Sequence, residues 1–256
     1  MSTESSVSLA PWGKVHPWFI SGFADASQKA LVVWGTNLQS TVGIKLTRKQ
    51  LATVRLTPYT KGVIVGLILS DGWLIISNSK NARLGFAQSG DRSEYFWFVF
   101  FSLSHYCSSY PNVRNRTRLG KQNIGIQILT RLMPCLTELH TLFYINGVKI
   151  VPHNIYDLLT PVALAHLIMG DGSVQRHGLI LCTDSYSIED VVRLINVLMI
   201  RYRLECTLRF YRKNQYRIYI RQGSMSLLRT IVTPYYHSSM LYKITSMSYK
   251  KKLLLY

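Results

Sequence analysis

Two aspartates, Asp71 and Asp171, are the residues of this sequence best suited to do chemistry. Each ends an apolar run and is followed by glycine, first as GVIVGLILSDG (residues 62–72) and again as VALAHLIMGDG (residues 162–172). Two such runs placed side by side would bring both carboxylates to the end of one buried seam. Carboxylates that close repel each other unless a cation lies between them, and a divalent cation is the natural candidate. The repeat therefore predicts a metal site shared by two halves of the chain.

The two apolar runs are expected to be helices that pack closely. Thr57-Pro58 precedes the first run and Thr160-Pro161 precedes the second, and a threonine cap followed by proline is typical of a helix start. Small residues recur every four positions, which lets another backbone approach. The residues on this stripe are Gly62, Gly66 and Ser70 in the first run and Val162, His166 and Gly170 in the second.

The same order of elements follows each run. Strand pairs are expected at residues 73–77 with 83–88 and 112–118 with 123–130, then at residues 173–175 with 179–183 and 204–211 with 216–221. Helices are expected at residues 94–108, 134–144 and 188–202. The predicted fold class is α+β, with two pseudo-symmetric α-β-β-α-β-β-α halves that carry antiparallel sheets.

Alternation along these strands gives each sheet an apolar face under the helices and an open face rich in Arg, Tyr, Gln and Asn. The apolar face is expected to contain Leu74, Ile76, Leu84, Phe86, Ile124, Ile126, Ile128, Leu204, Cys206, Leu208 and Phe210. A solvated face would also alternate, but it does not require Arg and Tyr with almost no Glu, so we favour a nucleic-acid platform. The residues expected to contact nucleic acid, which the resemblance described below implies is DNA, are Trp73, Ile75, Ser77, Lys80, Arg83, Gly85, Arg114, Arg116, Arg118, Gln127, Gln175, Arg176, His177, Thr183, Thr207, Arg209, Tyr211, Arg212, Lys213, Arg217, Tyr219 and Arg221.

The net charge also indicates a polyanionic partner. The chain has 30 Lys and Arg against 12 Asp and Glu, which gives +18 at pH 7. Nucleic acid is favoured over a membrane, because the longest apolar stretches are too short to span a bilayer. A merely basic protein, such as a ribosomal protein, is the alternative. The four cysteines stand singly, so neither a zinc site nor a disulfide framework is indicated.

The sequences IVGLILSDG (residues 64–72) and LAHLIMGDG (residues 164–172) resemble the motif of the LAGLIDADG homing endonucleases, in their two-motif, single-chain form. The resemblance extends from Gly35 to the C-terminus. One departure is that the first acidic position of the motif is Leu69 in one copy and Met169 in the other. Only the second acid, Asp71 or Asp171, is kept.

The resemblance also implies roles for particular residues. Mg²⁺, for which Ca²⁺ or Mn²⁺ could substitute, would be bound by Asp71, Asp171 and the backbone of Ser70 and Gly170. Lys149 and Lys243 resemble the basic residues that reach the scissile phosphates, and Gln88 resembles an amide that orients water. The implied catalytic set is Asp71, Asp171, Lys149, Lys243 and Gln88. Thr183 stands where the second half would have that amide, so the two strands are not expected to be cut at equal rates.

The function implied by the resemblance is a monomeric, metal-dependent endonuclease whose saddle-shaped sheets straddle double-stranded DNA. It would make a double-strand break with 3′ overhangs in a long asymmetric target and so promote homing of a group I intron. The alternative is an RNA-binding maturase that assists splicing of its own intron, and a third possibility is a transcriptional regulator. Retention of both aspartates favours cleavage.

The resemblance further implies an origin in a fungal mitochondrial intron. A protein made inside the organelle needs no import signal, and none is evident. Residues 1–34 are expected to be a partly disordered leader or a relic of another motif, residues 35–152 the first half and residues 153–256 the second half.

Overall fold

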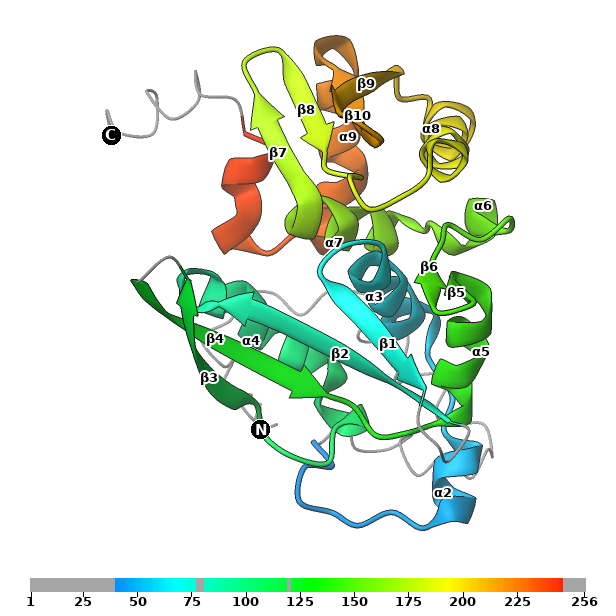
Figure 1. Cartoon of the computed structure of the whole chain (residues 1–256), viewed down its shortest axis with the longest axis vertical. Helices are drawn as coiled ribbons and strands as arrows, with labels where there is room; N and C mark the ends of the chain where they lie inside the picture. Colours follow the sequence, from blue (N-terminus) through cyan, green and yellow to red (C-terminus); the bar gives the residue numbers. More distant parts are fainter. Residues whose placement is uncertain (1–39, 77–80, 119–120, 246–256) are drawn as a thin grey trace, which may run out of the picture. The chain divides into compact units, whose positions relative to one another are not determined.

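Helices α3 (Pro58–Leu69) and α7 (Pro161–Asp171) carry the two repeated runs and lie against each other at the centre of the fold (Figure 1). The computed structural model describes residues 40–76, 81–118 and 121–245. Thr57 Oγ1 accepts a hydrogen bond from the Thr60 amide at 3.1 Å, and Thr160 Oγ1 accepts one from the Ala163 amide at 3.3 Å. The predicted helix starts are therefore confirmed.

The small residues of the stripe meet at the seam between α3 and α7. A Cβ atom added at Gly66 would collide with the carbonyl oxygen of Ala163 and lie 2.5 Å from Cβ of His166. One added at Gly170 would lie 2.5 Å from Cβ of Ser70. Contacts this short leave no room for a side chain, so the glycines set how closely the two helices approach.

His166 is a packing residue within this seam. Its side chain is fully buried, and its Nδ1 shares a hydrogen bond with the hydroxyl of Tyr95 at 3.0 Å. Burial lowers the pKa of His166 to about 3, so the ring is neutral at physiological pH. A neutral, buried ring of this kind serves packing within the seam.

We expect Gly66→Ala to destabilise the fold by about 1 to 3 kcal/mol, because the added methyl group must push α3 away from α7. Thermal unfolding followed by circular dichroism would measure the effect. Gly223→Ala is the matched control, because nothing lies within 4 Å of the added Cβ there. Equal melting temperatures for the two variants would show that the seam tolerates a wider spacing.

The first half continues from α3 through two strand pairs and two helices. Its elements are β1 (Gly72–Ile76), β2 (Ala82–Ser89), the 3₁₀ turn η2 (Gly90–Arg92), α4 (Ser93–Leu103), η3 (Ser104–Tyr106), β3 (Asn112–Arg118), β4 (Lys121–Leu129) and α5 (Pro134–Phe143). The strands form an antiparallel sheet in the order β1-β2-β4-β3, and α4 lies behind it in the view of Figure 1.

The second half repeats this arrangement after α7. Its elements are β7 (Gly172–Gln175), β8 (Gly178–Leu181), α8 (Ile188–Tyr202), β9 (Cys206–Arg212), β10 (Gln215–Arg221), η4 (Gln222–Ser224), α9 (Met225–Val232) and η5 (Thr233–Tyr235). The antiparallel sheet has the equivalent order β7-β8-β10-β9. The predicted α+β fold with two α-β-β-α-β-β-α halves is confirmed.

Two short elements return the chain to the seam. The hairpin of β5 (Tyr144–Ile145) and β6 (Val148–Lys149) turns through Asn146 and Gly147, both at positive φ, and brings Lys149 back toward the end of α3. The 3₁₀ segment η6 (Ser238–Lys243) brings Lys243 to the end of α7 in the same way. The remaining helices are α2 (Arg48–Thr53) and α6 (Ile155–Leu158).

The predicted apolar faces are correct at some positions and wrong at others. Leu74, Leu84 and Ile128 are buried. Ile76, Ile124, Leu208 and Phe210 are instead exposed by 49%, 57%, 39% and 70%. The helices cover only part of each sheet, and alternation in the sequence does not reveal where that cover stops.

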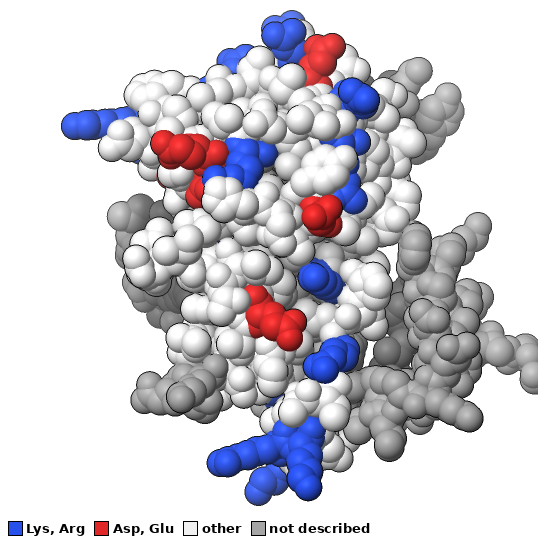
Figure 2. All heavy atoms as spheres, turned by 90° about the vertical axis from the view of Figure 1, so that its right-hand side faces the viewer, with Lys and Arg blue, Asp and Glu red and all other residues white. Residues whose placement is uncertain are grey.

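Charge is unevenly spread over the surface. Figure 2 shows Lys and Arg gathered at the lower end of one face, where α2 lies, with no Asp or Glu among them. No helix in the described part of the chain has the length and apolar character needed to cross a membrane. The predicted leader, residues 1–34, lies outside the described residues, and the boundary between halves at residues 152 and 153 stays a prediction.

Candidate active site

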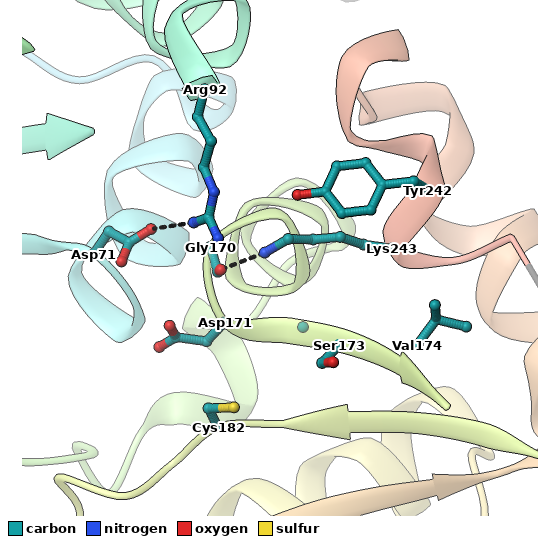
Figure 3. A pocket seen from close by; sticks show the side chains of 10 residues that line it. Asp71, Arg92, Gly170, Asp171, Ser173, Val174, Cys182, Tyr242 and Lys243 are labelled. Atoms are coloured by element: carbon teal, nitrogen blue, oxygen red, sulfur yellow. Dashed lines mark hydrogen bonds and ion pairs between the residues drawn. The ribbon is translucent and has the colours of Figure 1, made fainter. Parts of the chain in front are cut away.

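A pocket opens where the C-terminal ends of α3 and α7 meet (Figure 3). Its volume is about 520 Å³, and its lining includes Asp71, Arg92, Asp171, Cys182, Tyr242 and Lys243. Asp71 follows the end of α3, and Asp171 is the last residue of α7. Packing of the two helices therefore brings both aspartates into one site, as the repeat predicts.

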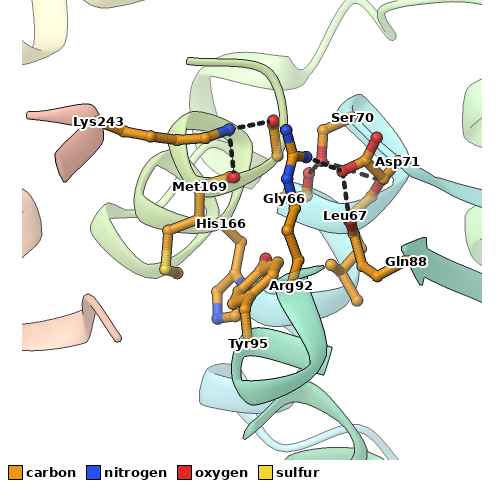
Figure 4. A network of polar contacts seen from close by, with 11 residues as sticks. Gly66, Leu67, Ser70, Asp71, Gln88, Arg92, Tyr95, His166, Met169 and Lys243 are labelled. Atoms are coloured by element: carbon orange, nitrogen blue, oxygen red, sulfur yellow. Dashed lines mark hydrogen bonds and ion pairs between the residues drawn. The ribbon is translucent and has the colours of Figure 1, made fainter. Parts of the chain in front are cut away.

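Asp71 is held by two residues of its own half (Figure 4). Gln88, near the end of β2, donates from Nε2 to Asp71 Oδ2 at 2.6 Å. Arg92, in the turn between β2 and α4, places a guanidinium nitrogen 4.0 Å from the same oxygen. An ordered amide and a nearby cation thus fix the orientation of this carboxylate.

Asp171 has no such support. Within the described part of the chain, its carboxylate accepts no hydrogen bond and forms no ion pair. Burial, followed by the charge of Asp71, raises the pKa of Asp171 to about 7. A carboxylate that is desolvated, unpartnered and close to a second carboxylate is stabilised by a bound cation.

The donors in this pocket fit a divalent cation. Across residues 40–76, 81–118 and 121–245, no three His, Cys, Asp or Glu side chains gather into a metal cage. Two carboxylates leave most coordination positions to water and phosphate oxygens. Mg²⁺ suits such a site, because it keeps several waters and is usually bound through one or two carboxylates.

Lys149 and Lys243 occupy equivalent places in the two halves. Lys149 Nζ donates to the carbonyl oxygens of Ile68, in the last turn of α3, and of Gly72, at the start of β1, at 2.9 and 2.8 Å. Lys243 Nζ donates to two at the end of α7, at 2.7 and 2.5 Å. The last carbonyls of a helix lack internal partners and favour a cation. Each lysine therefore fixes the helix end that carries an aspartate.

Burial is the main influence on both lysines. It lowers the pKa of Lys149, and it lowers the pKa of Lys243 to about 8. The charges of Asp71 and Asp171 act in the opposite direction and help to keep both side chains protonated. Lys243 lines the pocket, whereas Lys149 lies outside the pocket lining and bonds the backbone on either side of Asp71.

Two of the predicted site residues are engaged elsewhere. The Gly170 carbonyl, a predicted metal ligand, accepts the hydrogen bond from Lys243. Thr183, predicted to contact DNA, is 1% exposed and donates its hydroxyl to the carbonyl of Tyr216 at 2.6 Å. The prediction for Thr183 is wrong because its hydroxyl satisfies a backbone group inside the sheet. The metal role of the Ser70 backbone stays a prediction.

Arg92 and Tyr242 line the pocket but were not among the predicted site residues. Arg92 lies four residues after Gln88, immediately before α4. The only sequence signal was its place at a strand-to-helix junction, because strand alternation has already ended there. Tyr242 adjoins Lys243, so the approach of η6 to α7 carries both side chains into the site.

The open face of the first sheet is partly covered by one of its own side chains. Trp73 pairs in register with Gly85, and its indole would collide with a Cβ added there. Gly85 is therefore buried, and Gln127 is only 7% exposed, so the predicted DNA contacts at these two positions are corrected. Ile75 is 38% exposed, and Arg83 is half-buried.

Ser77 and Lys80 lie outside the described residues. The backbone of β3 contains Arg114, Arg116 and Arg118.

The open face of the second sheet consists of stacked arginine and tyrosine side chains. The guanidinium of Arg209 lies 4.2 Å from the ring centre of Tyr219, and that of Arg217 lies 3.3 Å from the ring centre of Tyr211. Arg217 also donates two hydrogen bonds to Asp184, at 2.7 and 2.6 Å, which raises its pKa. Its charge is therefore already paired, and its expected contribution to DNA binding is smaller than the sequence suggests.

The other predicted residues of this face are accessible. Gln175, Arg176, His177, Arg209, Tyr211, Arg212, Lys213 and Arg221 are exposed, and Thr207 and Tyr219 are half-buried. Planar cationic and aromatic groups of this kind can contact phosphates and bases.

Comparison with known proteins gives a consistent result. The chain is 32% identical over 170 residues to the cytochrome b mRNA maturase bI2 of Debaryomyces hansenii, covering 64% of this chain and 65% of that protein. It is 29% identical over 155 residues to the intron-encoded endonuclease ai4 of Dictyostelium discoideum, covering 57% of this chain and 97% of that protein. The chain thus spans less than two thirds of the maturase.

A solved structure agrees in fold. The homing endonuclease I-WcaI bound to its DNA recognition sequence superposes with a TM-score of 0.72 and 25% identity, covering 79% of this chain and 96% of that chain. A model of the LAGLIDADG DNA endonuclease family matches residues 61–228, which include most of α3, all of α7, both aspartates and both sheets. The chain therefore belongs to the LAGLIDADG DNA endonuclease family.

Proposed function

We propose that this protein is a homing endonuclease that makes a metal-dependent double-strand break in a long, asymmetric DNA target. The observation that carries the proposal is the pairing of Asp71 and Asp171 in one pocket, with the Asp171 carboxylate unpartnered. This pocket lies between two sheets whose open faces carry arginine, tyrosine and amide side chains. Acids in such a position have no use in a protein that only binds nucleic acid.

Each residue of the pocket has a part in this proposal. Asp71 and Asp171 would hold Mg²⁺, which when bound supplies Lewis-acid chemistry at phosphate oxygens. Gln88 keeps the Asp71 carboxylate oriented, and Arg92 supplies positive charge beside the phosphate. Lys149 and Lys243 hold the helix ends in register, so that both carboxylates keep their positions.

The proposal is tested by incubating the protein with a randomised double-stranded DNA library, with and without Mg²⁺, and sequencing the cut ends. Metal-dependent cuts at one long asymmetric sequence, with short 3′ overhangs, are the expected result. Enrichment of bound DNA without any cut would contradict it.

The second candidate is a maturase that binds its own intron RNA. It is favoured by the similarity to the maturase bI2 of Debaryomyces hansenii. The basic open faces would then contact RNA, and the paired aspartates would be dispensable. Retention of splicing activity by an Asp71→Asn variant that no longer cuts DNA would assign both activities to one chain. Origin in an organelle and a monomeric state belong to the same proposal.

The two catalytic halves are expected to cut their strands at different rates. Gln88 and Arg92 serve Asp71, while the equivalent positions of the second half are Thr183, which bonds a carbonyl, and Ser187, which caps α8. A supercoiled plasmid with the target should therefore pass through a nicked intermediate, always nicked in the same strand.

Replacing Gln88 by Thr together with Arg92 by Ser removes this difference. Loss of groups that support a metal ligand slows a reaction by about 10- to 100-fold, so the faster cut should slow and the nicked intermediate should diminish. End-labelled duplexes would identify the strand. Thr183→Ser, which keeps the hydroxyl, serves as the control. Equal nicking of both strands by the unmodified protein would contradict this prediction.

A further inference from the structure

The segment around α2 carries a cluster of basic residues that lies outside the two sheets and their open faces. Lys45, Arg48, Lys49 and Arg55 lie within it, and all four side chains are exposed. None of the four forms an ion pair with any described residue. From residue 40 to residue 70 the sequence contains no Asp or Glu. Figure 2 shows Lys and Arg side chains gathered at its lower end, without Asp or Glu among them. We call these four residues the α2 cluster.

The segment that carries the α2 cluster is firmly anchored. Thr47 and Gln50 form a reciprocal capping box at the start of α2. Arg131, only 8% exposed, donates from Nη1 and Nη2 to Oγ1 and the carbonyl of Thr41, at 2.7 and 2.8 Å, and to the carbonyl of Ile44 at 2.7 Å. The Tyr106 hydroxyl donates to the carbonyl of Arg55 at 3.1 Å. Because the backbone of this segment is already fixed, little backbone conformational entropy is lost when its charged side chains bind a ligand.

Helix α2 lies on the side of the first half toward which β1 points (Figure 1). In Figure 1, β1 leads from the end of α3 toward that side, and β2 returns antiparallel to it. β2 has eight residues, which at about 3.3 Å each span about 26 Å, or about eight base pairs of B-DNA. A duplex that follows the sheet outward from the aspartates would therefore reach α2 beyond the base pairs that the sheet covers.

We propose that the α2 cluster binds the phosphate backbone of double-stranded DNA that flanks the target on the side of the first half. This inference rests on the proposed function, because it requires a duplex on the sheets. The stretch from Lys45 to Arg55 contains no aromatic residue. Single-stranded RNA is usually bound by stacking of its bases on aromatic side chains, whereas duplex phosphates need only positive charge, so the composition favours the duplex.

The test compares two duplexes that carry the target found by library selection, one of about 20 base pairs and one of about 50 base pairs with long flanks. The variant is Lys45→Gln, Arg48→Gln and Lys49→Gln combined. The matched control, Lys45→Arg, Arg48→Lys and Lys49→Arg, keeps every charge. Dissociation constants are measured over a range of salt concentrations, and single-turnover cleavage is measured at saturating protein.

For the long duplex, the neutral variant should bind at least about tenfold more weakly, and its log–log salt slope should fall by about 2 to 3, which is 0.9 per lost phosphate contact. Binding of the short duplex and the rate of cleavage of bound DNA should stay unchanged. The charge-conserving control should behave as the unmodified protein.

Three outcomes would overturn the inference: no loss on the long duplex, an equal loss on both duplexes, or a loss only for a transcript of the intron RNA. Failure of the proposed function would look different, because the unmodified protein would then cut neither duplex. The two failures are therefore distinguishable in one experiment.

Discussion

Asp71→Asn or Asp171→Asn is expected to abolish DNA cleavage while leaving the affinity for the same duplex almost unchanged. Each substitution removes one of the two charged ligands that the pocket offers to a divalent cation. A bound metal lowers the barrier of phosphodiester hydrolysis by several kcal/mol, so the rate should fall by about a thousandfold or more. Binding survives because the phosphates are contacted mainly by the open faces of the sheets.

Single-turnover cleavage and equilibrium binding, measured on the same duplex, separate these two effects. Asp157→Asn is the matched control, because Asp157 is exposed on α6 and lies outside the pocket lining. Cleavage that persists in both pocket variants would remove the two aspartates from the reaction. Loss of binding with intact folding would instead assign them a place in the DNA-binding surface.

Asp171→Asn is also expected to stabilise the metal-free protein at alkaline pH. The pKa of Asp171 rises from 3.8 to about 7 in the folded protein, because of burial first and the charge of Asp71 second. Between pH 4 and pH 7 the folded state therefore binds more protons than the unfolded state, and stability falls as pH rises through this window. Above pH 7 the full cost of the buried charge is present.

The expected gain for Asp171→Asn is on the order of 1 to 3 kcal/mol at pH 8, reduced from the full shift because the side chain is partly solvated. The gain should vanish toward pH 4, where Asp171 is protonated in both states. Urea unfolding in EDTA at several pH values would measure it, again with Asp157→Asn as the control. Mg²⁺ should stabilise the unmodified protein more at pH 8 than at pH 5.5, because its binding requires the ionised carboxylate. A pH-independent difference between variant and parent would contradict the raised pKa.

Both predictions depend on features that the sequence already indicated. The Thr-Pro starts of α3 and α7 and the small residues along each helix are local signals, and they determine which faces can meet. Once Gly66 and Gly170 allow close contact, Asp71 and Asp171 must come together at the helix ends. The order of strands and helices could be predicted for the same reason, since period-2 and period-3.6 patterns are set within a few neighbouring residues.

The surroundings of the aspartates could not be predicted in this way. Gln88 and Arg92 support Asp71, while Thr183 turns inward to bond the Tyr216 carbonyl and leaves Asp171 without an equivalent partner. Thr183 lies just beyond the end of β8 at Leu181, and nothing in the sequence there distinguishes a hydroxyl that faces solvent from one that satisfies a backbone group. The two half-sites differ because their side chains find different partners on distant strands and turns.

The sequence by itself therefore determined the two helices, the paired acids and the order of elements around them. Each of these depends on short-range periodicity, on prolines that start the helices and on glycines that let the helices approach. The tertiary structure alone decided that the two lysines bind backbone carbonyls beside the two aspartates, that Arg92 enters the pocket, and that part of each predicted apolar face is left exposed. These features depend on where elements far apart in the sequence end relative to one another in the fold. No short stretch of the chain encodes that relative position.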